Sequence, residues 1–423
     1  MTVFSRNAAL SSLFSLHKQR LALEEGLAPE AIAAAIEDGS MVLLGNPAHP
    51  HVQPIVVGQP SRVKVNANIG TSPLNHCLQT ELQKIDTAVQ AGADTVMDLS
   101  IAGNLEAIRT GMLARCSAPL GTVPMYAVGQ VYLDAQRDIA EMDPELLFQE
   151  IARQAEQGVD FVTVHCGLTQ RGVEWAMDGS RLMGIVSRGG ALLARWMRHN
   201  GKENPLLTDF DRIVDIALRH NVTLSLGDGL RPGAGCDAGD AAQFEEVLTH
   251  GRLARHALSR GVQCMIEGPG HVRLHEVASQ IQTIKRLTNN APLYVLGPLV
   301  TDTAPGYDHI AGAIGGAAAV QAGADFLCYL TPAEHLTLPD VHDVRAGVLA
   351  SRIAAQAGET ALGRPQAIAR ENAISKARVA LDWEGMSQLA YDPEMVRARR
   401  EPHKHEEACA MCGKFCAVKM MQP

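Results

Sequence analysis

Apolar residues recur along the chain in short runs, and each run ends in a polar residue or glycine before a longer segment with helical periodicity. Near-continuous apolar runs separated by helices are typical of parallel strands that are covered on both faces. The sequence therefore predicts eight strands, at Thr95–Leu99, Gly121–Tyr126, Asp160–His165, Met183–Ser187, Val222–Leu226, Val262–Glu267, Leu293–Leu296 and Asp325–Tyr329.

Eight strand–helix repeats fit a closed (β/α)8 TIM barrel, and a doubly wound open sheet is the alternative. Polar and glycine-rich motifs follow many of the predicted strands. In a closed barrel the loops after all of these strands meet at one mouth, so the recurring motifs favour the barrel. We expect this α/β barrel to be the catalytic domain, at residues 71–338.

The flanking segments predict smaller parts. Residues 1–70 are expected to form an α/β cap over the barrel bottom or side, with a helix at Leu23–Glu37 and a strand at Met41–Leu44. Residues 339–400 predict C-terminal helices, and residues 401–423 begin with a polar stretch. That stretch is typical of a mobile linker, here followed by a tail that carries cysteines.

Composition and charge exclude several classes of protein. The 423 residues are 46% hydrophobic and 20% charged, as in globular proteins. Lys and Arg number 37 against 46 Asp and Glu, a net charge of −9, so the basic excess of a nucleic-acid binder is missing. No apolar stretch reaches the roughly 18 residues of a membrane span, and the N-terminus does not resemble a signal peptide. We expect a cytoplasmic protein that binds neither membrane nor nucleic acid.

The cysteines are distributed unevenly. Six of the nine are far apart, which argues against a disulfide framework, whereas Cys409, Cys412 and Cys416 lie together in CAMCGKFC. Three thiolates can hold a [4Fe-4S] cluster and leave one iron open to a small molecule. A zinc knuckle completed by His403 or His405 is equally compatible with the spacing, and a reactive-thiol tail is a further alternative.

Two histidines follow predicted strands at the same end of the barrel. His271 closes GPGH after the strand that ends at Glu267, and His335 closes TPAEH after the last strand. Two imidazoles at one mouth are expected to share a divalent metal that keeps open positions, with Glu267 or Glu334 as hydrogen-bonding partners. The alternative for each histidine is an ordinary hydrogen-bonded role in the core or at the surface.

Further polar motifs are expected around the mouth. SRGG at residues 187–190 and DGLRPG at residues 228–233 each combine glycine-rich backbone with an arginine, which suits a phosphate or carboxylate. Asp228 is expected to accept hydrogen bonds from a sugar hydroxyl or an amine, and Asn68 to bind a polar ring edge. Singly, each has a structural explanation, but together they predict a ligand with phosphate, polyhydroxyl and heteroaromatic parts. The other expected wall residues are Met97, Tyr126, His165 and Tyr294.

A series of motifs in one order resembles the thiamine pyrimidine synthase (phosphomethylpyrimidine synthase) family in its short form. The motifs are NANIGTS, GADTVMDLS, GTVPMY, GIVSRGG, SLGDGLRPG, MIEGPGH, YVLGPL, APGYDHI, TPAEHL and CAMCGKFC. The resemblance covers about residue 62 to the end. This family has a close paralogue, 5-hydroxybenzimidazole synthase, which acts in anaerobic cobalamin lower-ligand synthesis.

The resemblance implies a radical S-adenosylmethionine enzyme of the carbon–carbon lyase class. In such enzymes a [4Fe-4S] cluster reduces S-adenosylmethionine to a 5′-deoxyadenosyl radical, which abstracts hydrogen from 5-aminoimidazole ribotide. The resemblance also implies a homodimer, an electron donor such as flavodoxin or ferredoxin, and zinc or iron at His271 and His335. It assigns Cys409, Cys412 and Cys416 to the cluster and, with Glu267, to catalysis. It assigns ribotide binding to Asn68, Met97, Tyr126, His165, Ser187, Arg188, Gly189, Asp228, Gly229, Leu230, Arg231, Glu267 and Tyr294.

The product is less clearly indicated. Ile101 and Ala102 stand where the thiamine enzymes have Thr-Gly, and Ala127 stands where they have Gln. These positions follow predicted strands and are expected to line the pocket, so altered walls around retained anchors favour a different product. We therefore expect 5-hydroxybenzimidazole, with 4-amino-5-hydroxymethyl-2-methylpyrimidine phosphate as the alternative.

Two other functions fit parts of the sequence. A metal-dependent barrel hydrolase would use His271 and His335, with the three terminal cysteines as a structural zinc knuckle. A non-catalytic scaffold carrying a cluster or zinc would have no need of phosphate-binding turns at one barrel mouth, which argues against it.

Overall fold

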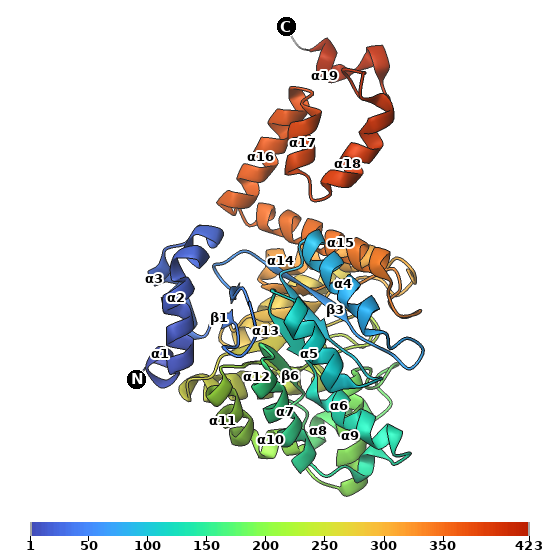
Figure 1. Cartoon of the computed structure of the whole chain (residues 1–423). Helices are drawn as coiled ribbons and strands as arrows, with labels where there is room; N and C mark the ends of the chain where they lie inside the picture. The colour runs from blue at the N-terminus through green and yellow to red at the C-terminus, as the bar shows by residue number, and fades with distance from the viewer. Residues whose placement is uncertain (1, 422–423) are drawn as a thin grey trace. The chain divides into compact units, whose positions relative to one another are not determined.

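The computed structural model describes residues 2–421 (Figure 1). Eight parallel strands form a closed barrel in the order β10-β3-β4-β5-β6-β7-β8-β9. This arrangement confirms the predicted TIM barrel. The strands are β3 (Lys64–Ile69), β4 (Thr95–Asp98), β5 (Leu120–Thr122), β6 (Phe161–Val164), β7 (Thr223–Leu226), β8 (Cys264–Glu267), β9 (Leu293–Leu296) and β10 (Phe326–Cys328).

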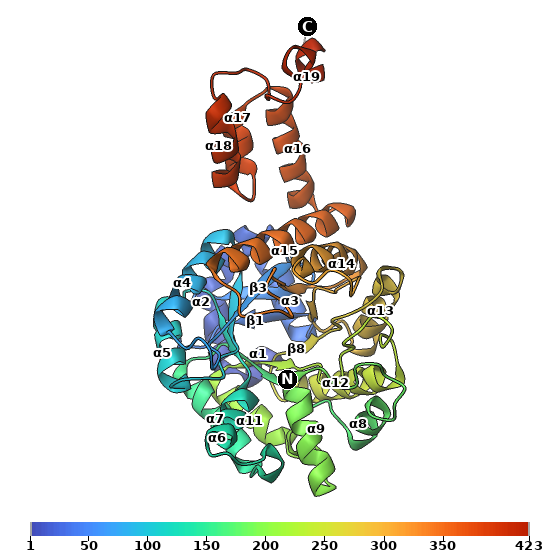
Figure 2. The same cartoon turned by 90° about the vertical axis from the view of Figure 1, so that its right-hand side faces the viewer.

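Helices surround the barrel and cover the outer faces of its strands (Figure 2). All residues of β4, β6 and β7 are buried, as expected of strands packed on both faces. The helices are α4 (Leu78–Ala91), α5 (Leu105–Arg115), α6 (Pro124–Asp134), α7 (Glu145–Gln157), α8 (Gln170–Ala176), α9 (Arg188–Asn200), α10 (Pro205–Thr208), α11 (Phe210–His220), α12 (Ala241–Ser259), α13 (Leu274–Leu287), α14 (Asp308–Ala322) and α15 (Val341–Ala361), with a short 3-10 helix at Ile139–Glu141.

The first barrel strand differs from the prediction, because β3 lies in a segment expected to be a cap and a loop. Its Asn66 and Asn68 interrupt the apolar pattern. Asn66 Nδ2 donates to Tyr294 Oη and to Asn68 Oδ1, both at 2.7 Å, across the barrel interior. The alternate residues of β3, such as Val65 and Ala67, are apolar and buried. The strand was missed because its inward-facing residues are polar and form hydrogen bonds with one another.

The predicted strand at Met183–Ser187 is wrong, since this apolar segment is a loop before α9. Side chains bind the backbone at the start of this loop. The carboxylate of Asp237 accepts the N–H groups of Leu182 and Met183 at 2.8 and 2.9 Å. Arg181 donates to both oxygens of Asp240, which anchors the start of the loop.

The N-terminal segment covers the bottom of the barrel. Its helices are α1 (Val3–Arg6), α2 (Ala8–Glu25) and α3 (Pro29–Asp38), and its antiparallel strands are β1 (Met41–Leu44) and β2 (Ile55–Gly58). The predicted helix Leu23–Glu37 is therefore two helices, separated at Gly26, which has a φ of 65°. Gln263, directly before β8, exchanges hydrogen bonds with the Leu43 backbone, so the cap meets the N-terminal ends of the strands.

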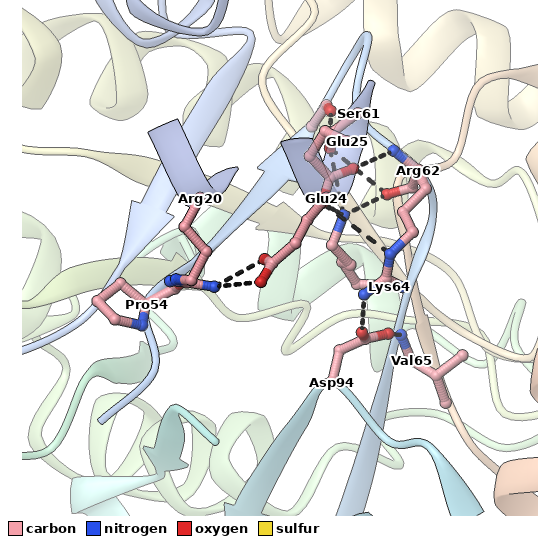
Figure 3. Close-up of polar contacts among 10 residues, drawn as sticks. Arg20, Glu24, Glu25, Pro54, Ser61, Arg62, Lys64, Val65 and Asp94 are labelled. Atoms are coloured by element: carbon pink, nitrogen blue, oxygen red, sulfur yellow. Dashed lines mark hydrogen bonds and ion pairs between the residues drawn. The ribbon is translucent and has the colours of Figure 1, made fainter. Parts of the chain in front are cut away.

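A buried ion cluster joins α2 to the start of β3 (Figure 3). Lys64 is fully buried, and its Nζ lies 3.0 Å from Glu25 Oε1. Arg62 donates its backbone N–H to Glu25 Oε2 at 2.8 Å and pairs with Asp94 at 2.5 Å. Charges buried this deeply are tolerated because each has an opposite charge and hydrogen bonds. The cluster therefore fixes the cap to the barrel.

The chain divides into two compact units, residues 1–358 and 359–423. The second unit holds α16 (Pro365–Val379), α17 (Trp383–Leu389), α18 (Pro393–Arg400) and α19 (Ala417–Met420), together with 3-10 turns at Glu401–His403 and Gly413–Phe415. Trp383 Nε1 donates to the Glu407 carbonyl at 2.9 Å, and Arg400 stacks on the Trp383 ring, which ties the stretch expected to be a linker to these helices. Within residues 2–421, no helix combines the length and apolar character that crossing a membrane requires.

Candidate active site

A cavity opens at the carboxyl ends of the barrel strands, and we call it the mouth cavity. Every strand from β3 to β10, or the loop that follows it, contributes to its wall. The sequence predicted much of this wall but missed Thr163 and Cys328. Both lie within predicted strands whose residues were expected to belong to the hydrophobic core. The lining residues are Asn68, Met97, Leu99, Val123, Tyr126, Thr163, His165, Asp228, Arg231, Glu267, Gly268, Tyr294, Val295, Leu296 and Cys328.

Asp228 and Arg231 form a charged pair after β7. Arg231 Nη1 donates to Asp228 Oδ1 at 3.2 Å, and Asp228 Oδ2 is buried without a partner among the described residues. Burial raises the pKa of Asp228 to about 8, although the positive charge of Arg231 opposes this shift. The unpartnered oxygen is therefore available to a ligand hydroxyl or amine.

The Glu246 carboxylate holds the backbone turn that carries Asp228 and Arg231. Glu246 on α12 accepts the backbone N–H groups of Gly229 and Leu230 at 2.9 and 2.8 Å. Gly229 lies against Leu168, and a Cβ there would overlap its side chain. Gly229 and Leu230 thus do not line the mouth cavity; they present Asp228 and Arg231 to it.

The start of α9 packs against His165. Ser187 is the N-cap residue and accepts the Gly190 N–H at 3.2 Å, so SRGG begins a helix where a strand end was expected. A Cβ on Gly189 would overlap the His165 ring. Burial and the nearby Arg231 charge lower the pKa of His165 to about 3, so its imidazole is neutral.

Arg188 and Tyr126 meet across the same side of the mouth. The Arg188 guanidinium lies 4.7 Å from the centre of the Tyr126 ring, within cation–π distance. Ser187, Arg188 and Gly189 do not themselves line the mouth cavity, but α9 places the first-turn amides and this arginine beside it.

The opposite wall is a chain of neutral hydrogen bonds. Asn66, which the sequence analysis did not single out, donates to Tyr294 and Asn68, and Asn68 Nδ2 donates to Cys328 Sγ at 3.0 Å. Burial raises the pKa of the Cys328 thiol to about 12, so it is protonated at neutral pH. This wall can bind a polar ring edge without adding charge.

Glu267 ends β8 and faces two hydroxyl groups. Its Oε1 accepts hydrogen bonds from Thr163 at 2.7 Å and from Ser225 at 2.8 Å. Ser225 lies on the adjacent strand β7 and Thr163 on the next strand, β6, so the barrel fixes the position of this carboxylate, which is one of the predicted catalytic residues.

The structure brings the two predicted metal-binding histidines together. The rings of His271 and His335 lie 5.4 Å apart, and each Nδ1 is held by a carboxylate, Asp302 at 2.7 Å and Asp308 at 3.2 Å. The expectation that Glu267 or Glu334 binds these histidines is therefore wrong, because the Nδ1 atoms bind Asp302 and Asp308 instead. Carboxylates at Nδ1 leave Nε2 free to bind a metal, so the pair fits such a site.

The three terminal cysteines lie in the second unit. Cys416 is buried, Cys412 is exposed and Cys409 is intermediate. The backbone N–H groups of Met411 and Cys412 lower the pKa of Cys409, which favours the thiolate form that binds iron. The donor type thus fits an iron–sulfur cluster, although residues 2–421 contain no ready-made group of three His, Cys, Asp or Glu around a metal position.

The positions that favoured a different product lie outside the mouth cavity. Ala102 is buried and accepts a hydrogen bond from Thr71 through its carbonyl, and Ala127 is buried in α6. Neither they nor Ile101 belong to the cavity wall. The expectation that they line the pocket is therefore wrong, and the argument from them to 5-hydroxybenzimidazole loses its basis.

A closed barrel with a charged cavity at its strand ends, linked to a unit that carries three closely spaced thiols, defines a barrel enzyme with a candidate cluster site. The sequence profile of the Radical SAM ThiC family matches residues 5–423, so this chain belongs to that family. Membership implies a [4Fe-4S] cluster and S-adenosylmethionine as cofactors, and it confirms the family resemblance noted above.

Individual relatives agree over nearly the full length. The chain is 50% identical over 406 residues to a phosphomethylpyrimidine synthase of Geobacter metallireducens, covering 95% of this chain and 92% of that protein. It is 47% identical over 404 residues to one of Methanocaldococcus jannaschii, covering 95% of each. A solved dihydropteroate synthase of Xanthomonas albilineans matches with a TM-score of 0.42 and 12% identity, over 77% of this chain and all of that one.

Proposed function

We propose that this chain is a phosphomethylpyrimidine synthase that converts 5-aminoimidazole ribotide into 4-amino-5-hydroxymethyl-2-methylpyrimidine phosphate for thiamine biosynthesis. The observation that carries the proposal is near-full-length similarity to proteins of that name, at 46–50% identity. The mouth cavity supports it, because its walls supply contacts for phosphate, ribose and ring. The alternative product, 5-hydroxybenzimidazole, has no counterpart among these relatives.

The ribotide phosphate would bind near Arg231 and the first turn of α9. Arg231 is already paired with Asp228, and Arg188 lies over Tyr126, so both guanidinium groups are oriented before the ligand arrives. Backbone amides at a helix start and arginine side chains are the usual phosphate donors in proteins. Asp228 Oδ2 would then accept a hydrogen bond from a ribose hydroxyl.

The imidazole ring would face the opposite wall. Asn68 and Tyr294 offer hydrogen bonds to a ring edge, and Glu267 offers a fixed carboxylate for the exocyclic amine. Neutral His165 can donate or accept one hydrogen bond without adding charge. When bound, the cluster and S-adenosylmethionine supply a 5′-deoxyadenosyl radical to this cavity, and Cys409, Cys412 and Cys416 would hold the cluster.

The two histidines would hold a divalent metal, zinc or iron, through their Nε2 atoms. Asp302 and Asp308 would keep both rings in the required tautomer. Metal analysis of the purified protein, compared with His271→Ala, tests this site. Metal bound equally by both proteins would contradict it. The electron donor, flavodoxin or ferredoxin, and the homodimer remain parts of the same proposal, and light scattering of the purified chain tests the dimer.

The deciding experiment is anaerobic turnover of the reconstituted protein with 5-aminoimidazole ribotide, S-adenosylmethionine and reductant, followed by mass spectrometry. We expect a phosphorylated pyrimidine, and none when S-adenosylmethionine is omitted. A hydroxylated benzimidazole as product would show that the chain has the activity of the paralogue, 5-hydroxybenzimidazole synthase. Aerobic, zinc-dependent hydrolysis without reductant would instead identify a barrel hydrolase.

A further inference from the structure

A second, smaller cavity lies behind the mouth cavity, and we call it the inner cavity. Asp228, Arg231 and Glu267 line both cavities, whereas Glu246 and His250 of α12 line only the inner one. Its volume is about 10 Å³. This is close to the roughly 10–15 Å³ that one water molecule needs, provided that polar groups surround it.

Two of the polar residues around the inner cavity have buried atoms without partners. Asp228 Oδ2 and both ring nitrogens of His250 make no hydrogen bond of normal geometry within the described part of the chain. Asp228 is 8% exposed and His250 is 1% exposed. Buried polar atoms without partners are costly, and an enclosed water molecule is the usual solution. The inner cavity thus has the size and the surroundings of a single-water site.

His250 also contacts the loops that follow two strands. Its Nε2 lies against Gly167, two residues beyond His165, and a Cβ at that glycine would overlap the imidazole. The Gly227 backbone, directly after β7, partly opposes the burial that lowers the pKa of His250 to about 3. The ring is therefore neutral, with one donor and one acceptor nitrogen, and it is wedged between the loops that carry His165 and Asp228.

We propose that His250 is a positioning residue that holds Asp228 through one water molecule in the inner cavity. The imidazole N–H points to the Gly227 carbonyl, the other ring nitrogen accepts a hydrogen bond from the water, and the water donates its second hydrogen to Asp228 Oδ2. A carboxylate oxygen accepts more than one hydrogen bond, so Oδ2 can bind the water and the ligand together. The part that concerns the ligand rests on the proposed function, since it takes the ligand to be the ribotide.

The test compares two variants in the full-length, cluster-reconstituted protein. His250→Leu keeps the volume but removes both nitrogens, and we expect the dissociation constant for the ribotide to rise about tenfold, as for one lost buried hydrogen bond. His250→Gln keeps a donor and an acceptor, and we expect near wild-type binding. His220→Leu is the matched control, because its Nε2 is also buried without a partner but lies at the barrel bottom, next to the start of β7.

Crystal structures supply a readout that does not depend on activity. We expect an ordered water molecule between Asp228 and residue 250 in the wild type and in His250→Gln, and none in His250→Leu. Unchanged ribotide binding in His250→Leu would overturn the inference, because His250 would then contribute nothing to binding. Equal loss of affinity in His250→Leu and His250→Gln would also overturn it, because the shape of the side chain and not its hydrogen bonds would then matter. If the wild type itself does not bind the ribotide, the proposed function fails, and the presence or absence of the water alone decides the inference.

Discussion

Burial sets the protonation state of single residues in the mouth cavity. Asp228 is the clearest example, because its pKa of about 8 means that the carboxyl group is largely protonated at neutral pH in the ligand-free protein. A protonated carboxyl group can donate as well as accept, so it can meet either a hydroxyl or an amine. Arg231 and Glu267 press its pKa in opposite directions, and burial dominates.

Replacing Asp228 by asparagine tests this protonation state. The folded-state pKa lies above the unfolded value of about 3.9, so the folded protein binds the extra proton and loses stability as the pH rises from about 4 to about 8. Asn does not titrate. We therefore expect Asp228→Asn to gain stability relative to wild type, by a few kcal/mol, across that range.

Urea unfolding of the ligand-free protein at several pH values measures the effect. Asp178→Asn is the control, because Asp178 is exposed and its pKa is lowered, so its titration lies below this window. Parallel pH profiles for wild type and Asp228→Asn would mean that Asp228 is ionised throughout.

The sequence identified charged and aromatic wall residues because they follow predicted strands. It could not reveal the residues that hold these side chains in position. Glu246, His250 and Asp302 lie far from the motifs they serve, and nothing local distinguishes them from surface carboxylates and imidazoles. Cys328 and Thr163 were missed for another reason, since each sits in an apolar run in which the inward-facing positions cannot be recognised.

At the scale of elements, close approach between a helix start and a loop sets the geometry of the site. The first turn of α9 reaches the mouth cavity because Gly189 has no side chain to meet His165. The elements themselves were predictable where apolar and polar residues follow a simple period. The prediction failed at β3, where inward asparagines broke the pattern, and at residues 183–187, where Asp237 accepts the Met183 N–H at the start of a loop.

Gly189→Ala should displace the start of α9. The new methyl group would overlap the His165 ring, and the helix must shift away, taking with it Arg188 and the amides that we propose bind the phosphate. We expect at least about a tenfold weaker affinity for the ribotide, the scale of one lost charge-assisted contact. Titration calorimetry checks this. Gly129→Ala in α6 is the control, because a Cβ there would make only an ordinary 3.4 Å contact with Leu192, and equal effects of both variants would refute the explanation.

The ion cluster between α2 and β3 predicts a different kind of effect. Lys64→Met leaves the Glu25 carboxylate buried without its ammonium partner, and we expect a loss of about 3 kcal/mol in the free energy of unfolding. Adding Glu25→Leu should restore most of that loss, since a buried pair can be replaced by apolar packing. Denaturant unfolding of the two variants measures the loss in the free energy of unfolding and its recovery. A double variant no more stable than Lys64→Met alone would show that the pair does not act as a unit.

At the scale of the whole molecule, the mouth cavity and the three closely spaced cysteines belong to separate compact units. The mouth cavity lies entirely within residues 1–358, whereas Cys409, Cys412 and Cys416 lie within residues 359–423. The sequence predicted boundaries after residues 338 and 400, whereas the two units meet at residue 358, and the polar stretch before the cysteines lies within the second unit. It cannot say that the same stretch is tied to its own helices through Trp383 and Arg400.

Cys412→Ala should therefore abolish one function and spare the other. A cluster with three protein ligands cannot be held by two, so we expect anaerobic reconstitution to yield little iron and sulfide and no cleavage of S-adenosylmethionine. Ribotide affinity and the melting temperature of the barrel should stay at their wild-type values, because no residue of the mouth cavity is changed. Cys77→Ala, another exposed cysteine, is the matched control and should keep its iron. Iron content equal to wild type in Cys412→Ala would remove the CAMCGKFC loop from the cluster site, and a matching loss of ribotide affinity would show that the two units depend on each other.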